Sequence, residues 1–218
     1  MLQPIIISTF LFLGMSCQTQ TEKGNKTEIN NQMTEEINET KLDSTILGAG
    51  CFWCVEAVFQ RVPGVKKIIS GYSGGQVKDP SYKEVCEGTT GHAEVIKLVY
   101  NPAEVSFETL LSVFWQTHDP TTLNRQGNDV GTQYRSAIFY LNENQKNIAE
   151  KIKKDLDTSG AFKAPIVTEI SAYSNFYEAE DYHQNYYNQN SSQGYCQYVI
   201  APKLEKFEKV FGNQFRKK

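Results

Sequence analysis

Residues 45–59 have the sequence Thr45-Ile46-Leu47-Gly48-Ala49-Gly50-Cys51-Phe52-Trp53-Cys54-Val55-Glu56-Ala57-Val58-Phe59. The first part is typical of a short buried strand and the second part of a helix. Gly50 lets the backbone turn tightly between them. The first turn of a helix carries unsatisfied N–H groups and a partial positive charge, and both favour a thiolate. We therefore expect Cys51 to be an activated nucleophile.

A second thiol, Cys54, follows one helical turn later, close enough for a disulfide with Cys51. By itself, a Cys-x-x-Cys pair indicates either a redox centre or half of a zinc site, and the aromatic residues between the thiols favour a substrate pocket. A structural zinc site needs four ligands. His92, His118 and His183 fall in predicted loops, but the chain has no second Cys-x-x-Cys pair. We expect no metal.

Composition limits the function classes. The 218 residues are 39% hydrophobic and 12% aromatic, which is ordinary for a globular protein. The formal net charge of −3 gives no basic signature for nucleic acid. The odd number of cysteines argues against a fully paired disulfide framework; the five are Cys17, Cys51, Cys54, Cys86 and Cys196.

The N-terminus has the features of an export signal. Residues 5–13 form an apolar run that is too short to span a bilayer but has the length of a signal-peptide core. Gly14-Met15-Ser16-Cys17 follows and resembles a bacterial lipoprotein cleavage site, with Cys17 as the acylated residue. A plain secretory signal and an uncleaved anchor are the alternatives. We expect residues 1–17 to be a signal peptide with a lipobox. The mature protein would be a membrane-anchored lipoprotein on the periplasmic side of the cell envelope, with lipid as its only membrane contact.

The polar segment after Cys17 has no aromatic and few aliphatic residues. Such a segment buries too little apolar surface to offset its ordering entropy. We expect residues 18–43 to be a disordered tether and residues 44–218 to be one folded domain. Strands are expected at 45–50, 67–72, 93–100, 134–141 and 165–170, and helices from 52 to Pro63, at 106–116, at 143–156 and from Pro202. This interleaved order predicts an α+β fold.

Glu94 is the candidate catalytic acid, and it lies in the clearest predicted strand, Ala93–Tyr100. Alternation places it on the same face as Ile96, Leu98 and Tyr100. A carboxyl group on that apolar face would have a raised pKa and would favour the protonated acid. A solvated glutamate at a strand end is the alternative that strand position alone leaves open.

Several separate segments resemble the A-type peptide methionine sulfoxide reductases. The resemblance extends from about Thr45 to about Phe211, in order and with matching spacing. The segments are Gly50-Cys51-Phe52-Trp53-Cys54, Gly71-Tyr72-Ser73-Gly74-Gly75, Pro80-Ser81-Tyr82, Gly91-His92-Ala93-Glu94-Val95, His118-Asp119-Pro120-Thr121, Asp129-Val130-Gly131-Thr132-Gln133-Tyr134-Arg135-Ser136 and Ala179-Glu180-Asp181-Tyr182-His183-Gln184.

The resemblance implies a two-layer α/β sandwich with a mixed, ferredoxin-like sheet. It also implies reduction of the S epimer of methionine sulfoxide, free and in oxidised proteins, with no metal or bound cofactor. We expect the protein to be a monomer. Cys51 would attack the sulfur and become a sulfenic acid. Glu94 would supply the acid, and Tyr82 and Tyr134 would hydrogen-bond the sulfoxide oxygen. Asp129 would order the polar network, and Phe52 and Trp53 would enclose the methyl group.

A second thiol would then form a disulfide with Cys51, and thioredoxin or a periplasmic dithiol would reduce it. We favour Cys54 as this resolving residue because it lies in the motif; Cys196 is the alternative. We expect Cys86 to pack as a small hydrophobic residue and His183 to be a structural hydrogen-bonding group near the site. The rival function is a general thiol–disulfide oxidoreductase that uses Cys51 and Cys54.

Overall fold

The computed structural model describes residues 42–215. The predicted signal peptide, Cys17 and all but the last two residues of the predicted tether lie outside this range. Between residues 42 and 215, none of the helices has the length and apolar character needed to cross a membrane.

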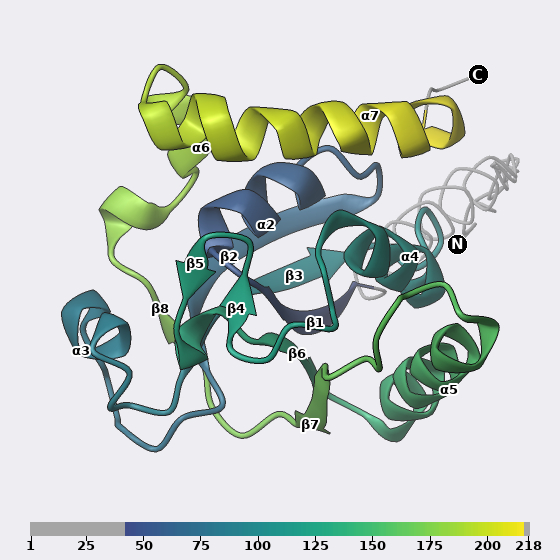
Figure 1. The fold of residues 1–218 in the computed structure, drawn as a ribbon, viewed down its shortest axis with the longest axis horizontal. Helices are drawn as coiled ribbons and strands as arrows, with labels where there is room; N and C mark the ends of the chain where they lie inside the picture. Colours follow the sequence, from purple (N-terminus) through teal and green to yellow (C-terminus); the bar gives the residue numbers. More distant parts are fainter. Residues whose placement is uncertain (1–41, 216–218) are drawn as a thin grey trace, which may run out of the picture. The chain divides into compact units, whose positions relative to one another are not determined.

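A six-stranded mixed sheet forms the centre of the domain (Figure 1). Its order is β7 (Glu169–Ala172), β6 (Ser136–Tyr140), β1 (Asp43–Ala49), β3 (Ala93–Tyr100), β2 (Val65–Ser73) and β8 (Tyr177–Glu178). The β6–β7 pair is parallel and the other pairs are antiparallel. Along the chain, β1, β2, β3 and β6 with two intervening helices form the β-α-β-β-α-β arrangement of ferredoxin-like folds.

The main helices are α2 (Phe52–Phe59), α4 (Phe107–Thr117), α5 (Glu143–Ser159) and α7 (Ala201–Phe215). Shorter elements are α3 (Tyr82–Cys86), α6 (Tyr186–Asn190), the 3-10 turns Thr132–Tyr134 and Asp181–His183, the π-helical turn Cys196–Ile200, and a small hairpin of β4 (Arg125–Gln126) and β5 (Asp129–Val130). In Figure 1, α7 runs alongside α2, and the two helices are in contact.

The core lies mainly on one face of the sheet. Leu47, Ile96, Leu98 and Ile138 of the strands pack there with buried residues of the four main helices. The opposite face holds a smaller cluster around Ile46, Val95 and Phe139, against which Phe176 packs. This arrangement confirms the predicted two-layer α+β fold. It also places Glu94, which precedes Ile96 on the same side of β3, on the helix-covered face.

The structure corrects several predicted boundaries. β1 begins at Asp43, the last residue of the predicted tether, and the Asp43 carboxylate accepts a hydrogen bond from the Tyr100 hydroxyl (2.9 Å). The strand expected at 165–170 begins only at Glu169, because Ile166 and Val167 donate their N–H groups to Asp157 and Pro120 instead of to β6. Between the strands expected at 67–72 and 93–100, where no helix is expected, the structure has α3, which starts in a capping box.

Candidate active site

The turn into α2 is built around Gly50, whose φ is +89°. A side-chain carbon at this position would lie 2.6 Å from Gln126. Gln126 is itself fixed, because its amide bonds to both the N–H and the carbonyl of Asp119 (3.1 and 3.0 Å). Only glycine fits this turn without strain. Cys51 follows as the N-cap residue of α2 and is buried.

Glu94 contacts the N-terminus of α2. Its Oε2 accepts a hydrogen bond from the backbone N–H of Phe52 (3.0 Å), which is one of the unsatisfied donors of the first helical turn. The side chain is buried, so the structure rules out a solvated strand-end glutamate. Burial raises the pKa of Glu94 to about 8, and the charges of Asp129 and Cys54 add to the increase. At neutral pH, Glu94 is therefore a proton donor.

Cys51 and Cys54 are both reduced and buried. Burial raises the pKa of the Cys51 thiol well above its usual value, and the hydrogen bond to Cys54 raises it further. The same hydrogen bond lowers the pKa of Cys54 to about 7. The sequence predicts that the helix N-terminus favours a thiolate at Cys51, and burial acts in the opposite direction.

Tyr195 connects Cys54 to Asp129. Its hydroxyl donates a hydrogen bond to Oδ2 of Asp129 (2.8 Å) and lies 3.8 Å from the sulfur of Cys54. Burial and the neighbouring thiols raise the pKa of Tyr195, so the hydroxyl keeps its proton. Asp129 reaches this position from the β4–β5 hairpin. The sequence analysis missed Tyr195, and the abundance of tyrosine between 182 and 198 was the available signal.

Tyr82 and Tyr134 are half-buried near Glu94. Tyr82 is the first residue of α3, and Tyr134 ends the 3-10 turn that leads into β6. Burial raises the pKa of both phenols, and the charge of Glu94 raises each further. Both hydroxyls therefore keep their protons at neutral pH, as Glu94 does.

Several aromatic side chains pack around Phe52 and Trp53, next to Cys51. Phe52 is fully buried, and its ring centroid is 6.5 Å from that of Tyr82 in a stacked arrangement. Trp53 stacks on Tyr186 with centroids 3.7 Å apart and contacts the edge of Tyr195 at 5.8 Å. An apolar site with aromatic walls suits a methyl group bound to sulfur.

The remaining thiols lie on different elements. Cys196 is buried in the π-helical turn that leads into α7. Cys86 is exposed on α3 and hydrogen-bonds to Tyr82, so the prediction that it packs as a small hydrophobic residue is wrong. Within residues 42–215, no three acidic, histidine or cysteine side chains are grouped closely enough to hold a metal ion.

Comparisons with known proteins identify the family. The family model described as peptide methionine sulfoxide reductase matches residues 43–215. A peptide methionine sulfoxide reductase MsrA of Chromobacterium violaceum is 53% identical over 172 residues, covering 79% of this chain and 98% of that protein. One from Nitratiruptor sp. is 56% identical over 169 residues, covering 78% and 96%.

Solved structures agree. Mxr1 from Saccharomyces cerevisiae in its reduced form is 35% identical, with a TM-score of 0.67 over 72% of this chain and 90% of that chain. Methionine sulfoxide reductase A of Corynebacterium diphtheriae is 36% identical, with a TM-score of 0.64 over 73% and 79%. This chain belongs to the peptide methionine sulfoxide reductase family.

Proposed function

We propose that this protein reduces the S epimer of methionine sulfoxide, both as the free amino acid and within oxidised proteins. The observation that carries the proposal is the grouping of a buried protonated carboxyl, two phenols and a buried dithiol beside an aromatic wall. A sulfoxide needs these groups: an acid for its oxygen, a soft nucleophile for its sulfur and an apolar place for its methyl group.

The first step makes methionine. Glu94, Tyr82 and Tyr134 hydrogen-bond the sulfoxide oxygen, which polarises the S–O bond and draws the sulfur of Cys51 to the electron-poor substrate sulfur. The oxygen passes to Cys51, which becomes a sulfenic acid, while the substrate sulfur gains two electrons and leaves as a thioether. The sulfoxide oxygen and the thiol proton of Cys51 together form the S–OH group of the sulfenic acid.

The second step makes a disulfide. The thiolate of Cys54 attacks the sulfenic sulfur of Cys51 and expels hydroxide, which takes up the proton that the Cys54 thiol lost and leaves as water. The low pKa of Cys54 and its contact with Cys51 support its role as the resolving thiol over Cys196. An external dithiol, either thioredoxin or a periplasmic dithiol reductase, then restores both thiols and is itself oxidised to a disulfide.

We also propose where the protein is located. The mature chain is exported as a lipoprotein anchored through lipid on Cys17, and it acts as a monomer on the periplasmic side of the envelope. The apolar run and Gly14-Met15-Ser16-Cys17 support this proposal. Labelled palmitate should be incorporated by wild-type cells and not by Cys17→Ser, and incorporation by both would refute the lipid anchor. A single monomeric species is expected in size-exclusion chromatography of the detergent-solubilised protein.

The chemistry is tested with separated S and R epimers of an N-blocked methionine sulfoxide and dithiothreitol. Turnover of the S epimer alone is expected. Without reductant, Cys54→Ser should release one methionine per chain and leave a dimedone-reactive sulfenic acid on Cys51, whereas Cys196→Ser should still form the disulfide. Disulfide exchange with no methionine release from either epimer would favour the general oxidoreductase function instead.

A further inference from the structure

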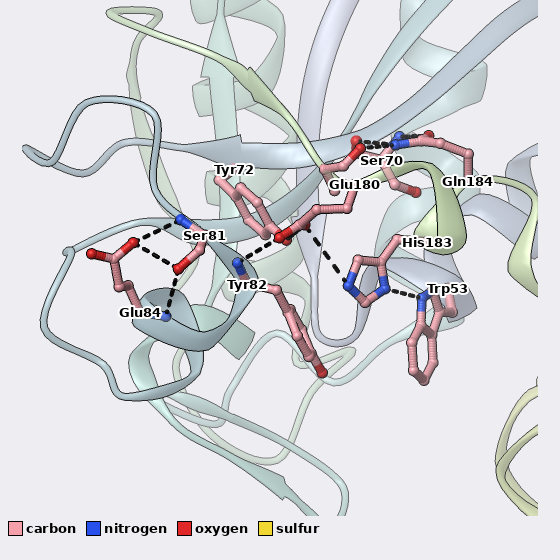
Figure 2. Close-up of polar contacts among 10 residues, drawn as sticks. Trp53, Ser70, Tyr72, Ser81, Tyr82, Glu84, Glu180, His183 and Gln184 are labelled. Carbon is pink, nitrogen blue, oxygen red and sulfur yellow. Dashed lines mark hydrogen bonds and ion pairs between the residues drawn. The ribbon is translucent and has the colours of Figure 1, made fainter.

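The segment Ala179–Gln184 contributes no group to the steps above, yet it lies against both walls of the site. Gln184 fixes the segment on β2: its Oε1 accepts from the N–H of Ser70 (2.9 Å), and its Nε2 donates to the carbonyl of Ser70 (2.9 Å). The N–H of Ala179 donates to the same carbonyl (2.9 Å). The backbone on both sides of Glu180 and His183 is therefore held in place (Figure 2).

Both carboxylate oxygens of Glu180 are used. Oε1 accepts a hydrogen bond from the backbone N–H of Tyr82 (2.9 Å), and Oε2 accepts one from the Tyr72 hydroxyl (2.8 Å). Tyr82 is the first residue of α3, so this bond fixes the start of the helix that carries the Tyr82 phenol. Figure 2 shows the carboxylate between Tyr72, Tyr82 and His183.

The protonation of His183 follows from its neighbours. Trp53 Nε1 donates to Nδ1 of His183 (3.1 Å), and an indole N–H can only donate. Nδ1 must therefore be unprotonated, and neutral His183 carries its proton on Nε2. Nε2 is buried, lies 3.9 Å from Oε2 of Glu180, and has no hydrogen-bond partner among the described residues. The negative charge of Glu180 favours that proton position over the other.

We propose that Glu180 is a positioning residue that holds two walls of the substrate pocket at once. Its Oε1 fixes Tyr82 at the start of α3, and its Oε2 keeps the proton of His183 on Nε2, so that Nδ1 can hold the Trp53 indole. This inference rests on the proposed function, because Tyr82 and Trp53 are there assigned to the sulfoxide oxygen and the methyl group.

Glu180→Gln is the sharpest substitution, because it keeps the shape and changes one acceptor into a donor. If the new carbonyl keeps the bond from Tyr82, the new amide N–H groups face Tyr72 and the N–H of His183. The negative charge that favours a proton on Nε2 of His183 is then absent. The proton moves to Nδ1, which can then no longer accept the hydrogen bond from the N–H of Trp53. The exposed Glu178, two residues away, provides the matched control Glu178→Gln.

The experiment measures methionine release from the blocked S epimer and, by ¹⁵N NMR, the tautomer of His183. Glu180→Gln should lower kcat/KM about 10- to 100-fold, with KM raised and kcat lowered, because both walls shift. It should also remove the Nε2–H signature of His183. Glu178→Gln should leave kcat/KM within about twofold of wild type, as expected for an exposed side chain away from the site, and leave the tautomer unchanged.

Equal kcat/KM values in the two variants would overturn the proposal, and so would a fall in activity with the His183 tautomer unchanged. If Glu180→Gln does not fold, the wild-type tautomer is still decisive: an Nδ1–H form of His183 would overturn the inference. If wild-type protein releases no methionine, the proposed function fails. The NMR result would still show whether Glu180 controls His183.

Discussion

Glu94→Gln should change how the stability of this protein depends on pH. In the unfolded chain Glu94 has its ordinary pKa of 4.5, and burial raises this pKa to about 8 in the folded protein. Between those values the folded protein binds a proton that the unfolded chain does not, so the free energy of unfolding falls as the pH rises. The contribution is fully present below pH 4.5 and is lost as the pH passes 8.

The size of the effect follows from the shift. At about 1.4 kcal/mol per pKa unit, a change from 4.5 to about 8 corresponds to about 5 kcal/mol. This is a large part of the total stability of a typical domain, which is about 5–15 kcal/mol. Glutamine has nearly the shape of the protonated acid and cannot ionise. Glu94→Gln should therefore match wild type near pH 4 and exceed its stability by about 5 kcal/mol at pH 9.

Urea unfolding under reducing conditions, repeated at intervals from pH 4 to pH 9, measures this difference. Subtracting the variant from wild type removes the titrations that the two proteins share. Glu150→Gln on α5 removes an exposed carboxyl group and controls for the loss of one charge. A wild-type minus Glu94→Gln difference that stays constant across this range would refute the assignment of Glu94 as a buried acid with a raised pKa.

Three further outcomes are expected. Methionine release in a single turnover should fall about tenfold per pH unit above pH 8, because Glu94 then loses its proton; a rate that stays level to pH 10 would contradict the acid role. Gly50→Ala should destabilise the protein by about 1–3 kcal/mol in chemical denaturation, because its φ of +89° is strained and the new carbon meets Gln126; an unchanged midpoint would refute this. Tyr195→Phe should leave methionine release intact but slow disulfide formation about fivefold, which corresponds to about 1 kcal/mol, because Cys54 loses its hydroxyl neighbour. Counting free thiols at intervals after one turnover measures the rate of disulfide formation. An unchanged rate would show that the hydroxyl has no part in this step.

Patterns within one element predicted the structure well. Ala93–Tyr100 alternates clearly, and the predicted strand has the same bounds as β3. The helix predicted at 106–116 corresponds to α4, whose N-cap is Ser106, and the Ser106 hydroxyl accepts from the N–H of Thr109 (3.2 Å). No helix was predicted at α3, which has only five residues. So short a helix has no apolar period to detect.

Contacts between distant segments could not be predicted from the residues alone. Tyr195 and Asp129 are 66 positions apart and meet only because the β4–β5 hairpin and the turn before α7 reach the same thiol. The pKa values of Cys51 and Cys54 depend on burial, which no local pattern gives. The alternation in β3 was enough to predict a raised pKa for Glu94, whereas the opposite pKa shifts of Cys51 and Cys54 depend on packing between distant segments.

The proposed mechanism gives the two thiols different roles, and the protons of the site fit that division. A charged Glu94 and a charged Cys51 would repel each other in a space without water, and burial keeps both protonated at rest. Cys54, beside the hydroxyl of Tyr195, ionises more easily. A thiol attacks a sulfur most effectively when its pKa is near the surrounding pH, and a pKa of about 7 meets that condition. In the proposed mechanism, the acid that acts on the sulfoxide oxygen and the thiolate that attacks the sulfenic sulfur can therefore be present at the same pH.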